Sequence, residues 1–179
     1  MKRALAIQTV LALVLALART IPAEAEMNPR FEALRPLLGK TWKGVFPNST
    51  ATKPVVDVSR FEVALNGQAV RNLHSINAGE YGGESLIVWD KAKDSLVFYY
   101  FTTAGYYTTG TMQAESGGFV AHENVIGDAE GITEVRSTSQ VGTDGRLHVV
   151  SQYLKKGQWV EGRNMYYSED KDAVVRFRD

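Results

Sequence analysis

The stretch Ser95–Gln113, SLVFYYFTTAGYYTTGTMQ, predicts a β-hairpin with aromatic side chains on both faces. Ala104-Gly105, a pair typical of a tight turn, separates two runs rich in aromatic and β-branched residues. A strand that borders solvent alternates apolar and polar residues, yet Phe98 to Phe101 follow one another without a polar break. We therefore expect one face of the hairpin to line an interior and the other to form an apolar outer surface.

Similar segments occupy almost all of the chain outside this hairpin. Short glycine-containing links separate them, and such links join antiparallel neighbours. Many strands in sequence order favour a sheet that closes on itself, because closure removes its edges. The sequence predicts an all-β fold, an antiparallel up-and-down meander closed into a roughly ten-stranded barrel. The expected strands are Thr41–Phe46, Val55–Leu65, Gln68–Asn77, Tyr81–Trp89, Ser95–Thr103, Tyr106–Ala114, Phe119–Ile126, Ile132–Val141, Arg146–Leu154 and Trp159–Tyr167.

One short helix is expected before the first strand, over Asn28–Leu38. Asn28 can cap it, Pro29 suits its first turn, and Gly39 ends it.

The first 25 residues have the layout of a secretory signal peptide. Lys2 and Arg3 precede an apolar run, and Ala23-Glu24-Ala25 matches the small-residue cleavage pattern. The run is too short for a spanning helix, which needs about 20 residues, although a membrane anchor is the alternative. We therefore expect a signal peptide at 1–25, one barrel domain at 26–179, and a periplasmic or secreted location in a bacterium.

Composition excludes several classes of site. The chain has no Cys, so disulfides, zinc–thiolate sites and thiol nucleophiles are excluded. Its three His are not spaced as metal ligands, so no metal site is expected. No basic stripe indicates a nucleic-acid partner, and no dinucleotide, phosphate-loop or serine-hydrolase motif indicates a cofactor or a nucleophile.

Several stretches resemble known barrel families. LLGKTWKGVF (37–46) resembles the opening of lipocalin-like barrels, in which a first-strand Trp packs across the base. The stretches 67–90, 101–112 and 130–140 together resemble a bacterial family of unassigned function with such a barrel. Nitrobindin-like haem barrels share the opening and hold haem through a His near the C-terminus, but the last His here is His148. The resemblance implies a calycin-type barrel and no particular reaction.

Alternation across the expected turns predicts which side chains point inward. If Asn66-Gly67 is a two-residue turn, Glu62 faces Arg71, and this charged pair marks the outer face. Carrying the alternation through a two-residue Ala104-Gly105 turn gives an inward set that is unusually polar for a core. It includes Asn72, His74, Ser85, Trp89, Phe98, Tyr100, Tyr107, Thr109, Thr111, His122, Asn124, Glu134, Arg136, Ser151, Tyr153, Asn164 and Tyr166.

This mixed lining predicts a pocket for a small apolar or amphipathic molecule, since a barrel of this size leaves internal space. His122 and Arg136 should lie opposite each other near Glu134, as a seat for an anionic group or as an internal ion-pair network. His74 could be structural or act as a base, and Trp42 could be a plug or a ligand contact. The candidate ligand-binding residues are Trp42, His74, Trp89, Phe98, Tyr100, Tyr107, His122, Glu134, Arg136 and Tyr153.

Three functions remain open. The favoured hypothesis is an exported lipocalin-like protein that binds a small molecule without a cofactor. The second is an isomerase or cyclase that transfers protons inside the barrel. The third is an interaction protein with a filled barrel, since the outer apolar face could form a homodimer. That face is expected to comprise Leu86, Val88, Val97, Tyr99, Phe101, Tyr106 and Met112.

Overall fold

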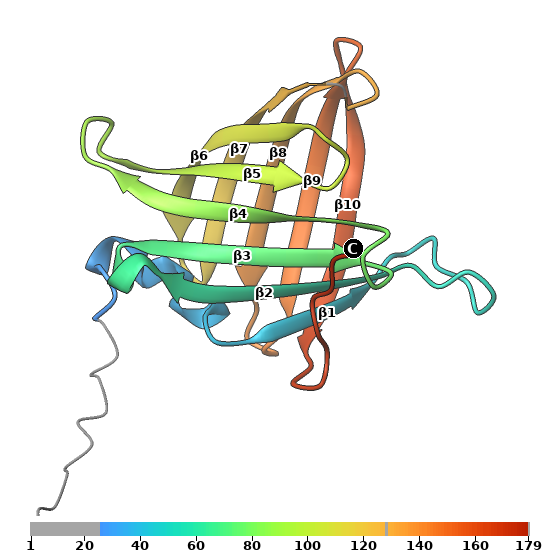
Figure 1. Cartoon of the computed structure of the whole chain (residues 1–179), viewed down its shortest axis with the longest axis horizontal. Helices are drawn as coiled ribbons and strands as arrows, with labels where there is room; N and C mark the ends of the chain where they lie inside the picture. The colour runs from blue at the N-terminus through green and yellow to red at the C-terminus, as the bar shows by residue number, and fades with distance from the viewer. Residues whose placement is uncertain (1–25, 128, 179) are drawn as a thin grey trace, which may run out of the picture.

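The computed structural model describes residues 26–127 and 129–178, which form a closed antiparallel barrel (Figure 1). Each strand pairs with its neighbours in sequence, and β1 pairs with β10 to close the sheet. The predicted all-β meander of ten strands is confirmed, whereas the predicted signal peptide lies outside the described residues. The strands are β1 (Thr41–Val45), β2 (Val56–Ala64), β3 (Ala69–Ile76), β4 (Tyr81–Asp90), β5 (Ser95–Thr102), β6 (Tyr107–Glu115), β7 (Gly118–Ile126), β8 (Ile132–Val141), β9 (Leu147–Lys155) and β10 (Gln158–Glu169).

The expected helix forms as a 3₁₀ helix, η1 (Pro29–Leu37). Asn28 caps it as predicted, because its side-chain oxygen accepts a hydrogen bond from the Arg30 N–H at 3.0 Å. Pro36 lies inside the helix and has no N–H to donate. A second short turn, η2 (Leu65–Gly67), links β2 to β3.

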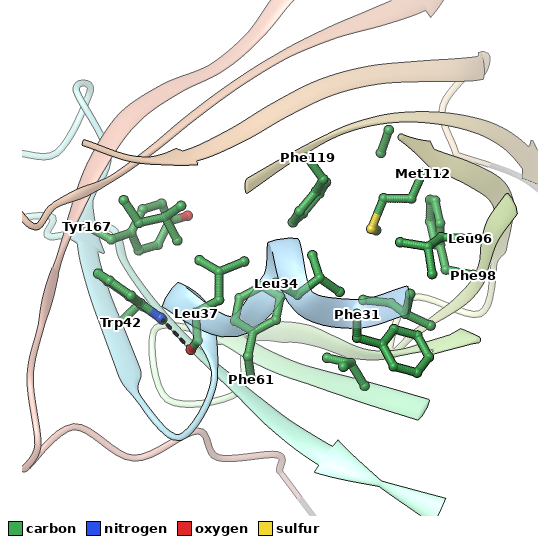
Figure 2. Packing of buried hydrophobic residues seen from close by; sticks show 14 of the residues in the cluster. Phe31, Leu34, Leu37, Trp42, Phe61, Leu96, Phe98, Met112, Phe119 and Tyr167 are labelled. Carbon is green, nitrogen blue, oxygen red and sulfur yellow. Dashed lines mark hydrogen bonds between the residues drawn. The ribbon is translucent and has the colours of Figure 1, made fainter. Parts of the chain in front are cut away.

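The helix η1 fills one end of the barrel. Its buried residues Phe31, Leu34 and Leu37 pack against side chains from several strands (Figure 2). It also contacts β6 and β7, across the barrel from the strand β1 that follows it. Trp42 is fully buried beside it and donates from Nε1 to the Leu37 carbonyl at 3.2 Å. We call this the helix end, and the opposite end, with the β1–β2, β3–β4, β5–β6, β7–β8 and β9–β10 links, the loop end.

The predicted register is correct from β2 to β5. Glu62 pairs with Arg71 and the two side chains form an ion pair on the outer surface. Phe61 and His74 point inward, and the same alternation carries through to Tyr100 on β5.

The predicted faces of β6 and β7 are wrong because the β5–β6 link has three residues instead of two. Phe101 pairs with Tyr107, and the Thr102 N–H donates to the Tyr106 carbonyl at 3.2 Å. Gly105 at the third loop position has a φ of +85°, which matches a three-residue hairpin loop that ends in a left-handed residue. A register change of one residue exchanges the two faces. The predicted inward residues Tyr107, Thr109, Thr111, His122 and Asn124 therefore point outward, and Tyr106 and Met112 point inward.

The β8–β9 link has the same three-residue geometry as the β5–β6 link. This second one-residue shift exchanges the faces again, so β9 regains its predicted inward face. Val141 pairs with Leu147, and Gly145 has a φ of +77°. The predicted inward placements of Glu134 and Arg136 on β8 are therefore wrong, whereas those of Ser151 and Tyr153 on β9 are correct.

A bulge in β10 changes the face again. The register with β9 shifts between Glu161 and Asn164, and a bulge of this kind redirects the side chains beyond it. Arg163 and Tyr167 consequently point inward, in place of the predicted Asn164 and Tyr166.

An apolar outer surface lies over β4, β5 and β6, as the opening hairpin indicated. Tyr99 and Phe101 are 48% and 55% exposed. Tyr107 stacks on Phe101 with ring centroids 5.9 Å apart and takes the place predicted for Tyr106. We define the outer apolar patch as Leu86, Val88, Val97, Tyr99, Phe101 and Tyr107.

Candidate functional site

The barrel holds a cavity of about 450 Å³ between the helix η1 and the loop end. Toward the helix end its walls are apolar, and they include Phe61, Phe98, Met112 and Phe119. Toward the loop end the walls carry hydroxyl, imidazole, carboxyl and guanidinium groups. This second set comprises Asp57, Ser59, Asn72, His74, Tyr81, Tyr100, Tyr106, Thr108, Glu123, Ser137, Ser151, Tyr153 and Arg163. The interior is therefore divided along the barrel axis into an apolar floor and an upper half in which these polar groups lie beside Phe46, Ile76, Val125 and Ile132.

A continuous chain of hydrogen bonds links the side chains of four strands around the upper half. His74 Nδ1 lies 3.1 Å from Asp57 Oδ1, and His74 Nε2 lies 2.6 Å from the Tyr100 hydroxyl. The Tyr81 hydroxyl lies 3.0 Å from that of Tyr100 and 2.7 Å from that of Tyr106. A carboxylate can only accept, so Nδ1 donates to Asp57, and in the neutral ring Nε2 accepts from Tyr100.

Asp57 is fully buried and holds three neighbours at once. Oδ1 contacts His74, and Oδ2 accepts from the Tyr167 hydroxyl at 2.8 Å and forms an ion pair with Arg163 Nη1 at 3.0 Å. Burial alone would raise the pKa of Asp57, but the hydrogen bond from His74, the charge that its ring carries when protonated, the charge of Arg163 and the hydrogen bond from Tyr167 hold it below the ordinary value. The carboxyl group therefore remains ionised inside the barrel.

The tyrosines of this network remain protonated phenols near neutral pH. Burial is the main cause that raises the pKa of Tyr81, Tyr100, Tyr106 and Tyr167 above the ordinary value.

Gly83 provides the space that Tyr100 needs on the neighbouring strand. A Cβ at position 83 would overlap the Tyr100 ring. The Gly82-Gly83 pair therefore marks a close approach between strands, and the pairing of β4 with β3 is continuous there.

Glu123 is the second carboxyl group of the cavity. Its Oε2 accepts from Thr108 Oγ1 at 2.8 Å. Burial raises the pKa of Glu123 above the ordinary value, and the bond from Thr108 and the charge of Arg163 offset this only in part. The cavity thus holds one carboxyl group whose pKa is lowered and one whose pKa is raised.

The structure brings four of the ten predicted site residues together in the cavity wall: His74, Phe98, Tyr100 and Tyr153. Two others serve the helix end, where Trp42 is a buried plug and Trp89 packs beside the core with the Arg30 guanidinium 4.3 Å from its ring.

The remaining four predicted site residues lie on the outer surface. His122 and Arg136 do pair across β7 and β8, as predicted, but on the outer face, where Arg136 stacks 4.0 Å from the Trp159 ring. Tyr107 and Glu134 share this outer orientation. The predicted seat for an anion is therefore not formed by His122 and Arg136 inside the barrel.

The sequence reasoning missed Asp57, Tyr106, Glu123 and Arg163 as candidate site residues. Asp57 could have been found, because it shares a strand face with Phe61 in the alternating run that begins at Val56. Tyr106 and Glu123 were hidden by the three-residue loop before β6, and Arg163 by the bulge in β10.

Within residues 26–127 and 129–178, no group of three or more His, Asp or Glu side chains is arranged to hold a metal ion. In the same part of the chain, no helix has both the length and the apolar character needed to cross a bilayer.

Comparison with known proteins supports the fold alone. No protein-family model matches the sequence, and no curated protein matches it. Among solved structures, the chain is similar to Rv2717c from M. tuberculosis, with a TM-score of 0.60 and 12% identity. The match covers 82% of this chain and 100% of the other. The barrel architecture is thus shared with a known structure.

Proposed function

We propose that this protein binds a small amphipathic molecule inside its barrel. The observation that carries the proposal is the cavity of about 450 Å³, whose floor is apolar and whose upper wall carries the polar groups. Its volume lies within the range of about 300–1,000 Å³ that is usual for small-molecule pockets. A ligand with an apolar tail and a polar head fits both halves, with the tail against Phe98 and Met112 and the head near His74 and Tyr106.

We also propose that the protein is an exported member of the lipocalin-like barrels. The charged start, the apolar run and Ala23-Glu24-Ala25 support export. N-terminal sequencing of protein from a periplasmic fraction should begin near Glu26. An intact Met1 in a cytoplasmic fraction would contradict this proposal.

Ligand binding can be tested by filling the cavity from one strand. Ser137 points into the cavity, and its neighbour Thr138 points outward. Ser137→Trp should abolish binding of the neutral fluorescent probe N-phenyl-1-naphthylamine, whereas the matched control Thr138→Trp should bind it like the wild type. Native mass spectrometry of the purified protein should show a bound small molecule that Ser137→Trp lacks. Failure of the folded wild type to bind the probe or retain any small molecule would contradict the proposal.

A second candidate is proton-transfer catalysis within the same cavity. It is favoured by the Asp57–His74–Tyr100 arrangement, in which a buried carboxylate orients an imidazole that contacts a phenol. The test is whether NMR shows the wild type converting a co-purified ligand to an isomer, and whether His74→Gln stops the conversion without loss of ligand binding.

A further inference from the structure

Arg163 is the one arginine or lysine among the described residues that line the cavity. The bulge in β10 turns it inward, where its guanidinium lies over the Phe46 ring at 5.2 Å. The Arg163 side chain remains 24% exposed and lines the cavity.

Only part of the Arg163 hydrogen-bonding capacity is used by the protein. Nη1 contacts Asp57 Oδ2 at 3.0 Å and donates to the Tyr167 hydroxyl at 2.9 Å. Among the described residues, neither Nε nor Nη2 has a hydrogen-bond partner. No buried side-chain nitrogen or oxygen in that part of the chain lacks a partner. The unpaired nitrogens are therefore not fully buried, and the side chain that carries them lines the cavity.

Nε and Nη2 form the side of a guanidinium that matches a carboxylate. They present parallel N–H groups in one plane, and such pairs bind both oxygens of a carboxylate at once. The Asp57 and Tyr167 contacts fix the other side of the group, so little side-chain freedom remains to be lost on binding.

We propose that Arg163 is the seat for the head group of an anionic ligand, and that the ligand is an amphipathic carboxylic acid. This inference rests on the proposed ligand binding and specifies its chemical class. The carboxylate lies against Nε and Nη2 of Arg163 in the polar upper half, and the apolar tail extends toward Phe98 and Met112.

The charges around the seat are compatible with an anion. Asp57 is already paired with Arg163, His74 and Tyr167. Burial raises the pKa of Glu123, the other cavity carboxyl group, so its charged form is less favourable there than in water. Tyr81, Tyr100, Tyr106 and Tyr153 contribute phenol groups from the surrounding wall, which carry no negative charge while protonated.

The test compares acids with matching neutral alcohols at pH 6. Decanoate and decanol form one pair and cinnamate and cinnamyl alcohol the other, and each competes with N-phenyl-1-naphthylamine for the wild-type protein. The acid of at least one pair should displace the probe at a concentration about tenfold or more below that of its alcohol, as expected for a charge-assisted hydrogen-bonded pair. Arg163→Met should remove this preference and retain displacement by the alcohol, whereas Arg136→Met, on the outer surface, should keep it.

A folding control separates binding from stability. Arg163→Met leaves the buried Asp57 carboxylate with one partner fewer, so the double variant Asp57→Asn with Arg163→Met removes both charges together. Arg163→Lys should keep the charge but lose most of the preference, because an ammonium cannot bind both oxygens in one plane.

An alcohol that displaces the probe as well as its acid does in both pairs would overturn the inference and leave the proposed ligand binding intact. A preference that persists in the folded double variant would also overturn it. Failure of the probe to bind at all would instead contradict the proposed function.

Discussion

Asp57 is the residue on which the polar half of the cavity depends. It is fully buried, accepts hydrogen bonds from His74 on β3 and Tyr167 on β10, and forms an ion pair with Arg163 on β10. A buried charge costs free energy unless it is paired, and the loss of one partner leaves the other uncompensated. Asp57 therefore stabilises the barrel by pairing with the guanidinium of Arg163.

Substitution of this carboxylate should destabilise the protein strongly. Asp57→Ala should lower the free energy of unfolding by about 3–5 kcal/mol, because Arg163 would be left without its charged partner. Asp57→Asn should cost less, since its amide oxygen still accepts a hydrogen bond. Urea denaturation measures both, with Asp170→Asn as the control on the exposed pair with Lys43. An Asp57→Ala variant as stable as the control would show that the network does not stabilise the fold.

Glu123 should make stability fall as the pH rises. Its pKa is raised in the folded state, so the folded protein binds its proton more tightly than the unfolded chain, in which the value is about 4.3. The favourable contribution of Glu123 to the free energy of unfolding is complete below the pKa that Glu123 has in the unfolded chain. It is lost as the pH rises through the pKa that Glu123 has in the folded protein.

Glu123→Gln removes this dependence because the amide does not titrate. The free energy of unfolding of the wild type should decline relative to Glu123→Gln as urea titrations move from pH 4 to pH 8. Glu134→Gln, on the outer face of the adjacent strand β8, should follow the wild type. Parallel curves for the wild type and Glu123→Gln would contradict the raised pKa.

At the scale of elements, the hairpin loops decide which side chains reach the cavity. The three-residue link between β5 and β6 places Tyr106 and Met112 inside, whereas a two-residue link would expose them. Gly105 occupies the left-handed position of this loop, and no other atom lies within 4 Å of where its Cβ would be. The positive φ is therefore the main restriction on which residue can occupy position 105.

Substitutions at Gly105 should follow backbone preference. Gly105→Val should lower the free energy of unfolding by about 1–3 kcal/mol, because a β-branched residue is strained at positive φ. Gly105→Asn should cost clearly less, since Asn visits this region more readily. Thermal and urea unfolding of the two variants give the comparison. Equal losses would indicate that steric contact, and not backbone strain, sets the requirement.

Part of the fold could be predicted from local sequence features. Alternation, turn residues and the charged pair Glu62–Arg71 were sufficient to predict ten strands and to identify the inward faces of β2 to β5. Ala104-Gly105 is compatible with either loop length, and the choice depends on how the whole barrel packs. Gly162 inside the last strand is a local signal for the bulge there, but the same signal at Gly82-Gly83 marks a close approach, so the sequence does not distinguish the two. The inward placement of His74 and Tyr100 was therefore predictable, because both lie before the first three-residue loop. Tyr153 was placed correctly only because the one-residue shift at the β8–β9 link cancels the earlier shift at the β5–β6 link.

At the scale of the whole molecule, the barrel has a closed interior and an apolar exterior region. The outer apolar patch spans three neighbouring strands, and its exposed members Tyr99, Phe101 and Tyr107 lie side by side. Surfaces of this kind commonly mark contact sites. The homodimer predicted from the sequence remains a prediction, with Tyr107 in place of Tyr106.

Self-association should be visible in analytical ultracentrifugation. A stable dimer needs roughly 800 Å² per partner, and identical patches most often pair about a two-fold axis. The wild type should sediment as a dimer at high concentration, and Tyr99→Glu with Phe101→Lys should sediment as a monomer. The matched control is His122→Glu with Arg136→Glu, on strands outside the patch. A wild type that remains monomeric at high concentration would rule out the dimer.

The closure of the barrel has a consequence for the order in which the chain can fold. Nine ladders join strands that are adjacent in sequence, and the ladder of β1 with β10, in which Trp42 pairs with Glu169, joins the two ends of the sheet. During synthesis each hairpin can form soon after it is made, but β1 keeps an unpaired edge until β10 is complete. Pairing between distant segments is slow because the loop must close before any contact compensates for it. An open edge can meanwhile recruit strands of other chains, so the yield of folded protein should depend on how quickly this last ladder forms.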